Sequence, residues 1–82
     1  MAQFLGVHRL EADMSLEDVQ SGFNKYKEEA AKIGIKALYA HYSLEKGLLY
    51  CLTEADSADQ VRAAHQNISI PLEDVIEVRE VE

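Results

Sequence analysis

The sequence has one cysteine, one proline and no long hydrophobic run. The single cysteine excludes an internal disulfide, and the lack of a long hydrophobic run excludes a membrane-spanning helix. The single Cys51 cannot form an intramolecular disulfide, which is typical of a protein from a reducing compartment. No apolar stretch approaches the roughly 18–20 residues that cross a bilayer. The first residues, Met1-Ala2-Gln3-Phe4, lack the basic start and the long apolar segment of a secretion signal. We therefore expect a cytoplasmic protein that is not inserted in a membrane.

Basic residues are also few. Eight lysines and arginines stand against fifteen acidic residues, which gives a formal net charge of −7. Such a surface repels the phosphate backbone of nucleic acids, which proteins bind through clustered Lys and Arg. It is equally unsuited to an anionic membrane surface. Neither a nucleic acid nor a membrane is therefore an expected partner, whereas a cation is compatible with the charge.

The composition is that of an ordinary globular protein, with 48% apolar and 28% charged residues. A chain of 82 residues has the length of one domain, which we expect to cover residues 1–82. A domain of this size has a free energy of unfolding on the order of 4–12 kcal/mol. Because no disulfide adds to that free energy, self-association would be a natural supplement.

Hydrophobic periodicity and turn residues predict six short elements. Ser15 and Asp18 form a capping box, and apolar residues then recur at three- and four-residue steps until Gly34, which predicts a helix. Ser57 and Gln60 repeat the capping box before a shorter helix. A five-residue connection that ends in glycine indicates an antiparallel hairpin between two strand-like runs. The predicted strands are 3–9, 36–42, 48–54 and 75–81, and the predicted helices are 15–33 and 57–68.

The order β-α-β-β-α-β determines the predicted fold. Two βα units around a hairpin are typical of the ferredoxin-like fold. We therefore predict an α+β protein, a βαββαβ sandwich with one antiparallel sheet and two helices on one face. In this fold the third strand lies between the first and the second. Because the helices cover one face of the sheet, the other face should be polar if it meets water.

Alternation along the strands divides the sheet residues into two sets. The set that we assign to the core beneath the helices is Leu5, Val7, Leu38, Ala40, Tyr42, Leu48, Tyr50, Leu52, Ile76 and Val78. The set that we assign to the uncovered face is Phe4, Gly6, His8, Ala37, Tyr39, His41, Leu49, Cys51, Thr53, Val75, Glu77 and Arg79. The second set is too apolar for a face in water, so we predict a homodimer packed sheet to sheet through or around it. A slip of one residue in any strand would exchange its two faces.

Three histidines, His8, His41 and His65, are the candidate metal ligands, because imidazole is the side chain that titrates nearest neutral pH. The alternation places His8 and His41 on the uncovered face, on either side of the third strand and about 9–10 Å apart at Cα. A carboxylate or a residue of a second subunit could complete a site there. His65 lies late in the second helix, where the helix dipole also favours a cation. Imidazole with carboxylate suits nickel, zinc, copper or iron, although no HxH, HxxxH or CxxC pair marks the site.

Two other residues have more than one interpretation. A cysteine on a strand, such as Cys51, is most often a small buried hydrophobic residue, and the alternative is a thiolate nucleophile or a metal ligand beside His8 or His41. Gly22 weakens the first helix, and close packing against a neighbouring strand would explain its presence. No phosphate-binding glycine loop and no Ser-His-Asp order is present, so the sequence gives little direct support to an enzyme.

Specific segments resemble a known family. They are Phe4–Arg9 (FLGVHR), Tyr50–Ala55 (YCLTEA), a following helix with Val61 and His65, and Asp74–Val78 (DVIEV). These segments are similar to a family of small bacterial ferredoxin-like proteins, about 80 residues long and of otherwise unassigned function, whose known member is a nickel-binding, nickel-responsive protein. The similarity spans almost the whole chain.

The resemblance implies a ferredoxin-like homodimer that binds divalent nickel on its surface, with a suggested role in sequestration or detoxification. The residues that match the family pattern are His8, Cys51, Glu54 and His65. The chain departs from the pattern in the first helix, where relatives often carry His and Asp and this chain has Phe23 and Tyr26. It also has His41 in the second strand, where relatives often carry Trp.

Two functions from different classes follow. The leading hypothesis is a small cytoplasmic protein that binds divalent nickel, with His8 as the first ligand and His41 and His65 as the next candidates. The alternative is a small dimeric α+β barrel enzyme or ligand-binding module, in which His8, His41 and Cys51 line a cavity between the two sheets and one histidine is a general base. A deep pocket around these residues, without metal affinity, would favour the alternative. A domain that only assembles or regulates a larger complex would keep its partner after all three histidines are replaced.

Overall fold

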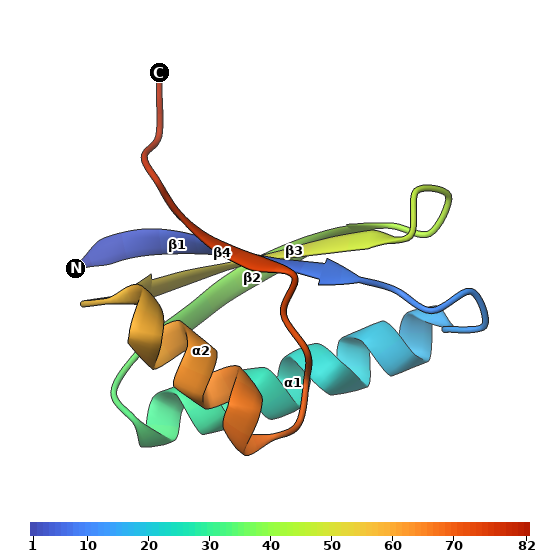
Figure 1. The fold of residues 1–82 in the computed structure, drawn as a ribbon, viewed down its shortest axis with the longest axis horizontal. Helices are drawn as coiled ribbons and strands as arrows, with labels where there is room; N and C mark the ends of the chain where they lie inside the picture. Colours follow the sequence, from blue (N-terminus) through green and yellow to red (C-terminus); the bar gives the residue numbers. More distant parts are fainter.

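The computed structural model describes residues 1–82 and contains the six predicted elements in the predicted order (Figure 1). The strands are β1 (Ala2–Arg9), β2 (Lys36–Ser43), β3 (Leu48–Ala55) and β4 (Asp74–Val78), and the helices are α1 (Leu16–Lys32) and α2 (Ala58–Asn67). The last strand ends three residues earlier than predicted. Its ladder with β1 ends at the pair Gln3 and Val78, one residue from the start of β1.

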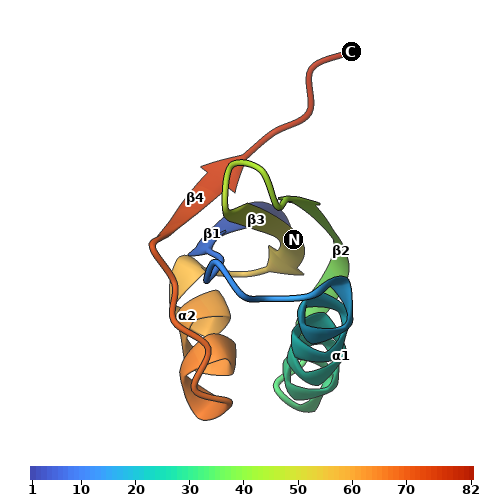
Figure 2. The ribbon, with the colours of Figure 1, turned by 90° about the vertical axis from the view of Figure 1, so that its right-hand side faces the viewer.

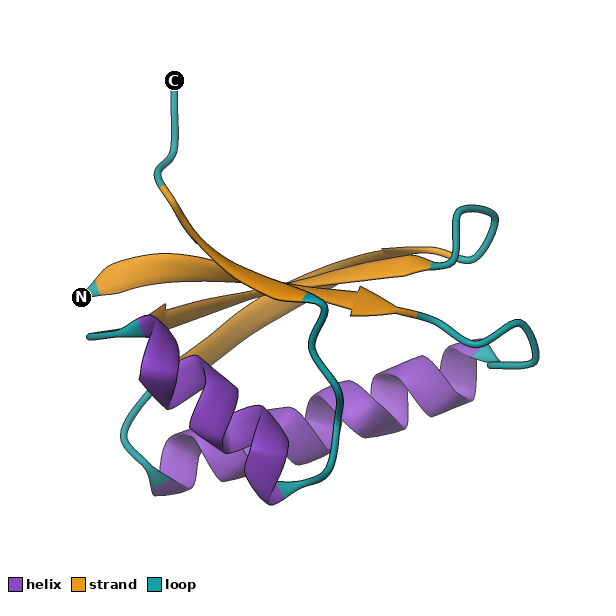
Figure 3. Cartoon of the chain, in the orientation of Figure 1, coloured by secondary structure: helices purple, strands orange, loops and turns teal.

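The strands form one antiparallel sheet in the order β2-β3-β1-β4. The prediction that the third strand lies between the first and the second is therefore confirmed. Both helices lie on the same side of the sheet, and the C-terminal residues leave the sheet toward its other side (Figures 2 and 3). No helix is both long enough and apolar enough to cross a membrane.

The helix ends follow the capping chemistry of the sequence. At the start of α1 the Ser15 hydroxyl accepts a hydrogen bond from the Asp18 amide, and the Asp18 carboxylate accepts one from the Ser15 amide. Hydrogen bonding to Ser15, first of all from its backbone amide to the carboxylate, lowers the pKa of Asp18. At the start of α2 only half of the predicted box is present: Ser57 caps the Gln60 amide, but the Gln60 side chain accepts from the Asp56 amide instead. Gly34, at a φ of +80°, follows the end of α1 as predicted.

The predicted assignment of the sheet faces is wrong for β1, β3 and β4: in β4, Val75 and Glu77 pair with the buried residues Gly6 and Phe4, whereas Ile76 and Val78 lie on the other side. The buried residues of β1 and β3 are Phe4, Gly6, His8, Leu49, Cys51, Thr53 and Ala55, and the first six pair with one another across the two strands. Side chains of both helices reach this set, since Tyr26 of α1 bonds Thr53 and His65 of α2 contacts Cys51. The set expected on the uncovered face therefore forms the core beneath the helices. Both sets are apolar, so alternation alone did not distinguish them.

A β-bulge changes the phase within β2. Ala37 pairs with Thr53 on the helix side, whereas Tyr39, beyond the bulge, pairs with Leu52. The prediction is therefore wrong for Ala37 and right for Tyr39 and for His41, which pairs with Tyr50 away from the helices. We call the side of the sheet without helices the open face. Its apolar and aromatic residues, with His41, are Leu5, Val7, Tyr39, His41, Leu48, Tyr50, Leu52, Ile76 and Val78, and Gln3, Arg9 and Glu54 lie toward its ends.

Candidate metal centre

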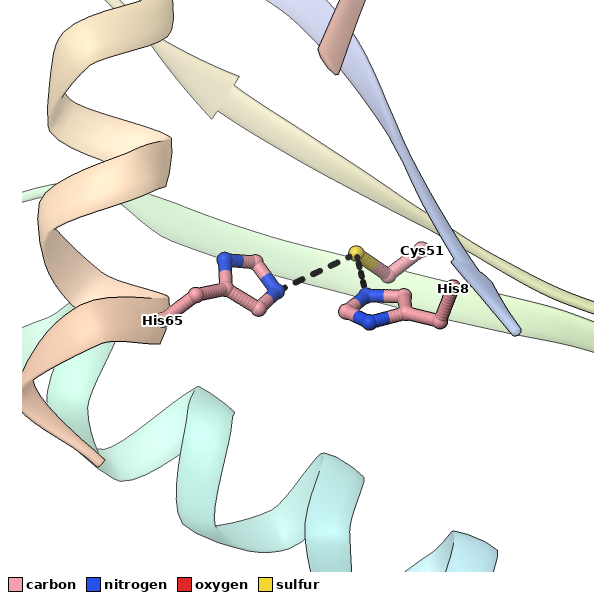
Figure 4. Close-up of side chains that lie close together, drawn as sticks. All are labelled: His8, Cys51 and His65. Atoms are coloured by element: carbon pink, nitrogen blue, oxygen red, sulfur yellow. Dashed lines mark hydrogen bonds between the residues drawn. The ribbon is translucent and has the colours of Figure 1, made fainter. Parts of the chain in front are cut away.

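Three side chains from three different elements converge between the sheet and the helices (Figure 4). His8 of β1, Cys51 of β3 and His65 of α2 are only 7%, 1% and 2% exposed. The Cys51 Sγ atom lies 3.4 Å from His8 Nε2 and 3.7 Å from His65 Nε2. One nitrogen or sulfur atom from each residue lies within 4.8 Å of the other two, which is close enough for one metal ion to contact all three. We call these residues the His-Cys-His cluster.

The sheet register brings the sulfur to this point. Gly6 pairs with Cys51 across β1 and β3, and a Cβ atom on Gly6 would lie only 2.7 Å from the Cys51 sulfur. Residue 6 must therefore lack a side chain for Cys51 to take this position. His8 lies two residues further along β1 and so points to the same side of the sheet. The sulfur and the first imidazole are thus placed by the backbone of two neighbouring strands.

Backbone carbonyl groups fix the orientation of both imidazoles. His65 Nδ1 lies 2.7 Å from the Val61 carbonyl oxygen, and His8 Nδ1 lies 3.0 Å from the Pro71 carbonyl oxygen. Because a carbonyl only accepts hydrogen bonds, each Nδ1 is the protonated donor. Each neutral ring therefore directs the lone pair of Nε2 at the Cys51 sulfur. Metal-binding histidines are held in the same way, through a hydrogen bond from the nitrogen that does not bind the metal.

Burial keeps all three groups uncharged at neutral pH. Desolvation lowers the pKa of His65 to about 4, with a smaller contribution from nearby His8, and it also lowers the pKa of His8. The same desolvation raises the pKa of the Cys51 thiol to about 11. The cluster without a metal therefore consists of one thiol and two neutral imidazoles.

One thiol proton cannot serve two acceptors. Every buried polar side-chain atom has a partner within hydrogen-bond distance, but the Cys51 S–H can donate to only one of the two Nε2 lone pairs. The other lone pair has no donor within the cluster, which leaves it available to a cation. A cation that displaced the thiol proton would be bound by all three groups at once, so the donor set fits a metal ion.

Tyr26 of α1 forms the wall behind His65. The two rings stack with centroids 4.0 Å apart, and the Tyr26 hydroxyl is hydrogen-bonded to the fully buried Thr53 hydroxyl. Burial raises the pKa of Tyr26, which keeps the phenol protonated. No carboxylate belongs to the cluster, so the chain itself supplies three ligand atoms there.

The structure brings together two of the three predicted histidines. His8 and His65 lie with ring centroids 4.9 Å apart, whereas His41 packs against Tyr39 on the open face. The predicted pairing of His8 with His41 is wrong, because His8 points to the opposite side of the sheet. Cys51 was predicted only as an alternative ligand. The residue that could have pointed to Cys51 is Gly6, which leaves room for the sulfur. That relation becomes visible only when the pairing of β1 with β3 is known.

A cavity of about 430 Å³ lies beside the cluster, and His8, Cys51 and His65 all contribute to its wall. This volume is within the range of small-molecule sites, roughly 300–1,000 Å³. The sequence-based alternative placed His8, His41 and Cys51 around a cavity between the two sheets of a dimer. The cavity found here lies on the helix side of the sheet instead, where His8 and Cys51 line it together with His65 and without His41.

Comparisons with known proteins agree with the fold. The crystal structure of SCO4226 from Streptomyces coelicolor A3(2) superposes with a TM-score of 0.89, covering 99% of this chain and 100% of that one at 21% sequence identity. A comparison with curated proteins finds no match. The family described as nickel responsive protein SCO4226-like matches residues 4–78, nearly the whole chain. The chain therefore belongs to the SCO4226-like family of nickel responsive proteins.

Proposed function

We propose that this protein binds one divalent metal ion per chain, nickel first, through His8, Cys51 and His65. The observation that carries the proposal is the convergence of two imidazole lone pairs on a single buried thiol. The family description supports nickel. His41 lies on the other side of the sheet, so we leave it out of this ligand set.

The chemistry of the three donors agrees with a late transition metal. Imidazole nitrogens bind nickel, copper and zinc, and a thiolate adds preference for these ions over magnesium or calcium. Three donors inside the protein, one of them an ionisable thiol, would remove such an ion from solution. We therefore propose sequestration or detoxification of the metal as the role. The lone unpaired thiol and the net charge of −7 support a cytoplasmic protein without a nucleic-acid partner.

Calorimetric titration with nickel chloride tests the site. We expect one nickel ion to bind each wild-type chain, and the His8→Ala variant to give no specific binding heat. The matched control is His41→Ala, which removes an imidazole of the open face and should bind nickel as the wild type does. Equal binding by the wild type and His8→Ala would show that the metal, if bound, is not held by this cluster.

The open face supports a homodimer. Its strands expose a continuous apolar surface that includes Leu5, Leu52 and Ile76, and no helix covers it. Large contiguous apolar surface is a feature of interaction sites. The face that we propose for the dimer is thus the same side of the sheet as predicted from the sequence, although most of its residues come from the other alternate set.

Sedimentation or light scattering of a charged variant tests the dimer. We expect the wild type to be dimeric and Leu52→Lys to be monomeric, because a lysine in the centre of the buried face would lose its hydration. Leu16→Lys is the matched control, since Leu16 lies on α1 and is already 52% exposed. A dimer that survives Leu52→Lys, or a wild-type chain that is monomeric at high concentration, would contradict the proposed interface.

The second candidate function is a small-molecule binding module, and the cavity beside the cluster favours it. Nucleophilic catalysis by Cys51 is less well supported, because its raised pKa leaves almost no thiolate at neutral pH without a metal. The nickel titration distinguishes the two candidates, since a binding module without a metal centre would show no nickel affinity.

A further inference from the structure

The cavity of about 430 Å³ lies between the first half of α1 and the segment that follows α2, residues 68–71. Figure 2 shows the two helices spread apart beneath the sheet. The wall of the cavity is formed by the His-Cys-His cluster together with apolar side chains from α1 and from the segment that follows α2. The apolar residues that matter below are Val19, Phe23, Ile68 and Ile70.

Gly22 also lines this cavity, and its presence has no packing reason. The sequence suggested that Gly22 allows close packing against a strand. In the structure, a Cβ atom on Gly22 would meet only the Ile70 Cδ1 atom, at 4.0 Å, which is an ordinary contact. Glycine in a helix interior is less favourable than alanine. The absent side chain therefore weakens α1 without relieving a clash, and its effect is to leave the cavity open.

The charged residues around the cavity are balanced. Arg9 and Lys25 are exposed there, as are Glu11 and Asp18. Such a rim does not select a strongly charged ligand, whereas the inner wall favours an apolar body. The three donor groups at the inner wall are the polar atoms that such a molecule would reach.

We propose that the cavity holds a small organic molecule with an apolar body and one nitrogen or sulfur donor atom, which reaches the metal site from the cavity. This inference rests on the proposed metal function. The cluster supplies three ligands and no carboxylate, and metal sites with three protein ligands commonly leave a further position for an exogenous ligand. Since all three donor residues line the cavity, a molecule in it has access to an ion that they hold.

Two probes of different size test the proposal on the cobalt-loaded protein, whose visible spectrum reports the surroundings of the ion. Imidazole and 1-benzylimidazole offer the same donor nitrogen, but only the second has a large apolar group. We expect both to change the cobalt spectrum. We expect 1-benzylimidazole to bind at least about tenfold more tightly, because its phenyl ring would be removed from water by the apolar wall.

Variants of α1 locate the binding. Gly22→Leu should place a side chain in the cavity, keep cobalt bound and weaken 1-benzylimidazole at least about tenfold, which cancels the gain from burying the phenyl ring. Ala31→Leu is the matched control, because Ala31 is exposed on the same helix and does not line the cavity. This control should bind both probes as the wild type does.

The outcomes separate the two proposals. If the wild-type protein shows no cobalt spectrum, the ligand proposal fails, and the nickel titration decides the metal function separately. If cobalt binds but neither probe changes the spectrum, or if both probes bind with equal affinity, the cavity is not a ligand site and the metal function stands. If Gly22→Leu keeps the full affinity for 1-benzylimidazole, the ligand binds elsewhere and the proposal is overturned.

Discussion

Replacing Cys51 with serine should lower the affinity for nickel at least about 100-fold, since loss of groups that only orient metal ligands already costs 10–100-fold. Serine has nearly the same shape, but its hydroxyl stays protonated and cannot replace a thiolate as a charged, polarizable donor. The nickel-loaded wild type should also show sulfur-to-metal charge-transfer absorption that the variant lacks. Calorimetry and ultraviolet absorption measure the two effects on the same samples.

The serine variant should remain folded, because its hydroxyl can donate the same single hydrogen bond to one of the two imidazoles. Circular dichroism and thermal unfolding of the metal-free chains provide this control. Nickel affinity within a few fold of the wild type, together with unchanged absorption, would mean that the sulfur is not a ligand. His8 and His65 would then hold the ion with groups from outside the cluster.

The metal-free protein should lose about 3 kcal/mol of stability through His65 alone as the pH falls from 6.5 to about 4. The folded-state pKa of His65 lies below its ordinary value, so the unfolded chain binds a proton in this range that the folded chain excludes. Stability contributed by the neutral ring is therefore complete above pH 6.5 and decreases as the pH falls. Burial lowers the pKa of His8 as well, which adds to the loss with the same sign.

Urea unfolding at several pH values measures this loss, and variants separate it from the titration of carboxyl groups. His65→Gln cannot be protonated, so its stability should depend less on pH than that of the wild type over this range. His41→Gln should follow the wild type, because His41 is exposed on the open face. Identical pH dependence of the wild type and His65→Gln would show that His65 is not buried as a neutral ring.

The elements of the fold were predictable from local signals. Ser15, Ser57 and Gly34 determine helix ends through groups a few residues away, and these interactions are readable in sequence. The faces of the sheet were not, because Leu5 and Val7 are as apolar as Phe4 and more apolar than Gly6. One feature of the buried face is size, since the absent side chain of Gly6 leaves room for the Cys51 sulfur, but this contact depends on how β1 pairs with β3.

The candidate site depends on contacts that sequence spacing does not contain. His8 and Cys51 are 43 residues apart, and Cys51 and His65 are 14 apart, so no local motif records the cluster. The residue types nevertheless identified His8 and His65, and the family pattern included Cys51. His41 was expected beside His8 because the predicted phase of β1 was inverted, and it lies on the other side of the sheet from the cluster.

The close approach of residue 6 to the Cys51 sulfur restricts the order in which positions 6 and 51 can be substituted during evolution. A side chain at position 6 would collide with the sulfur, so substitution there must follow the replacement of Cys51 by a smaller residue. Reversal of the cysteine loss would then be blocked for as long as the new side chain remained. In a lineage that took this path, loss of the thiol would be hard to undo.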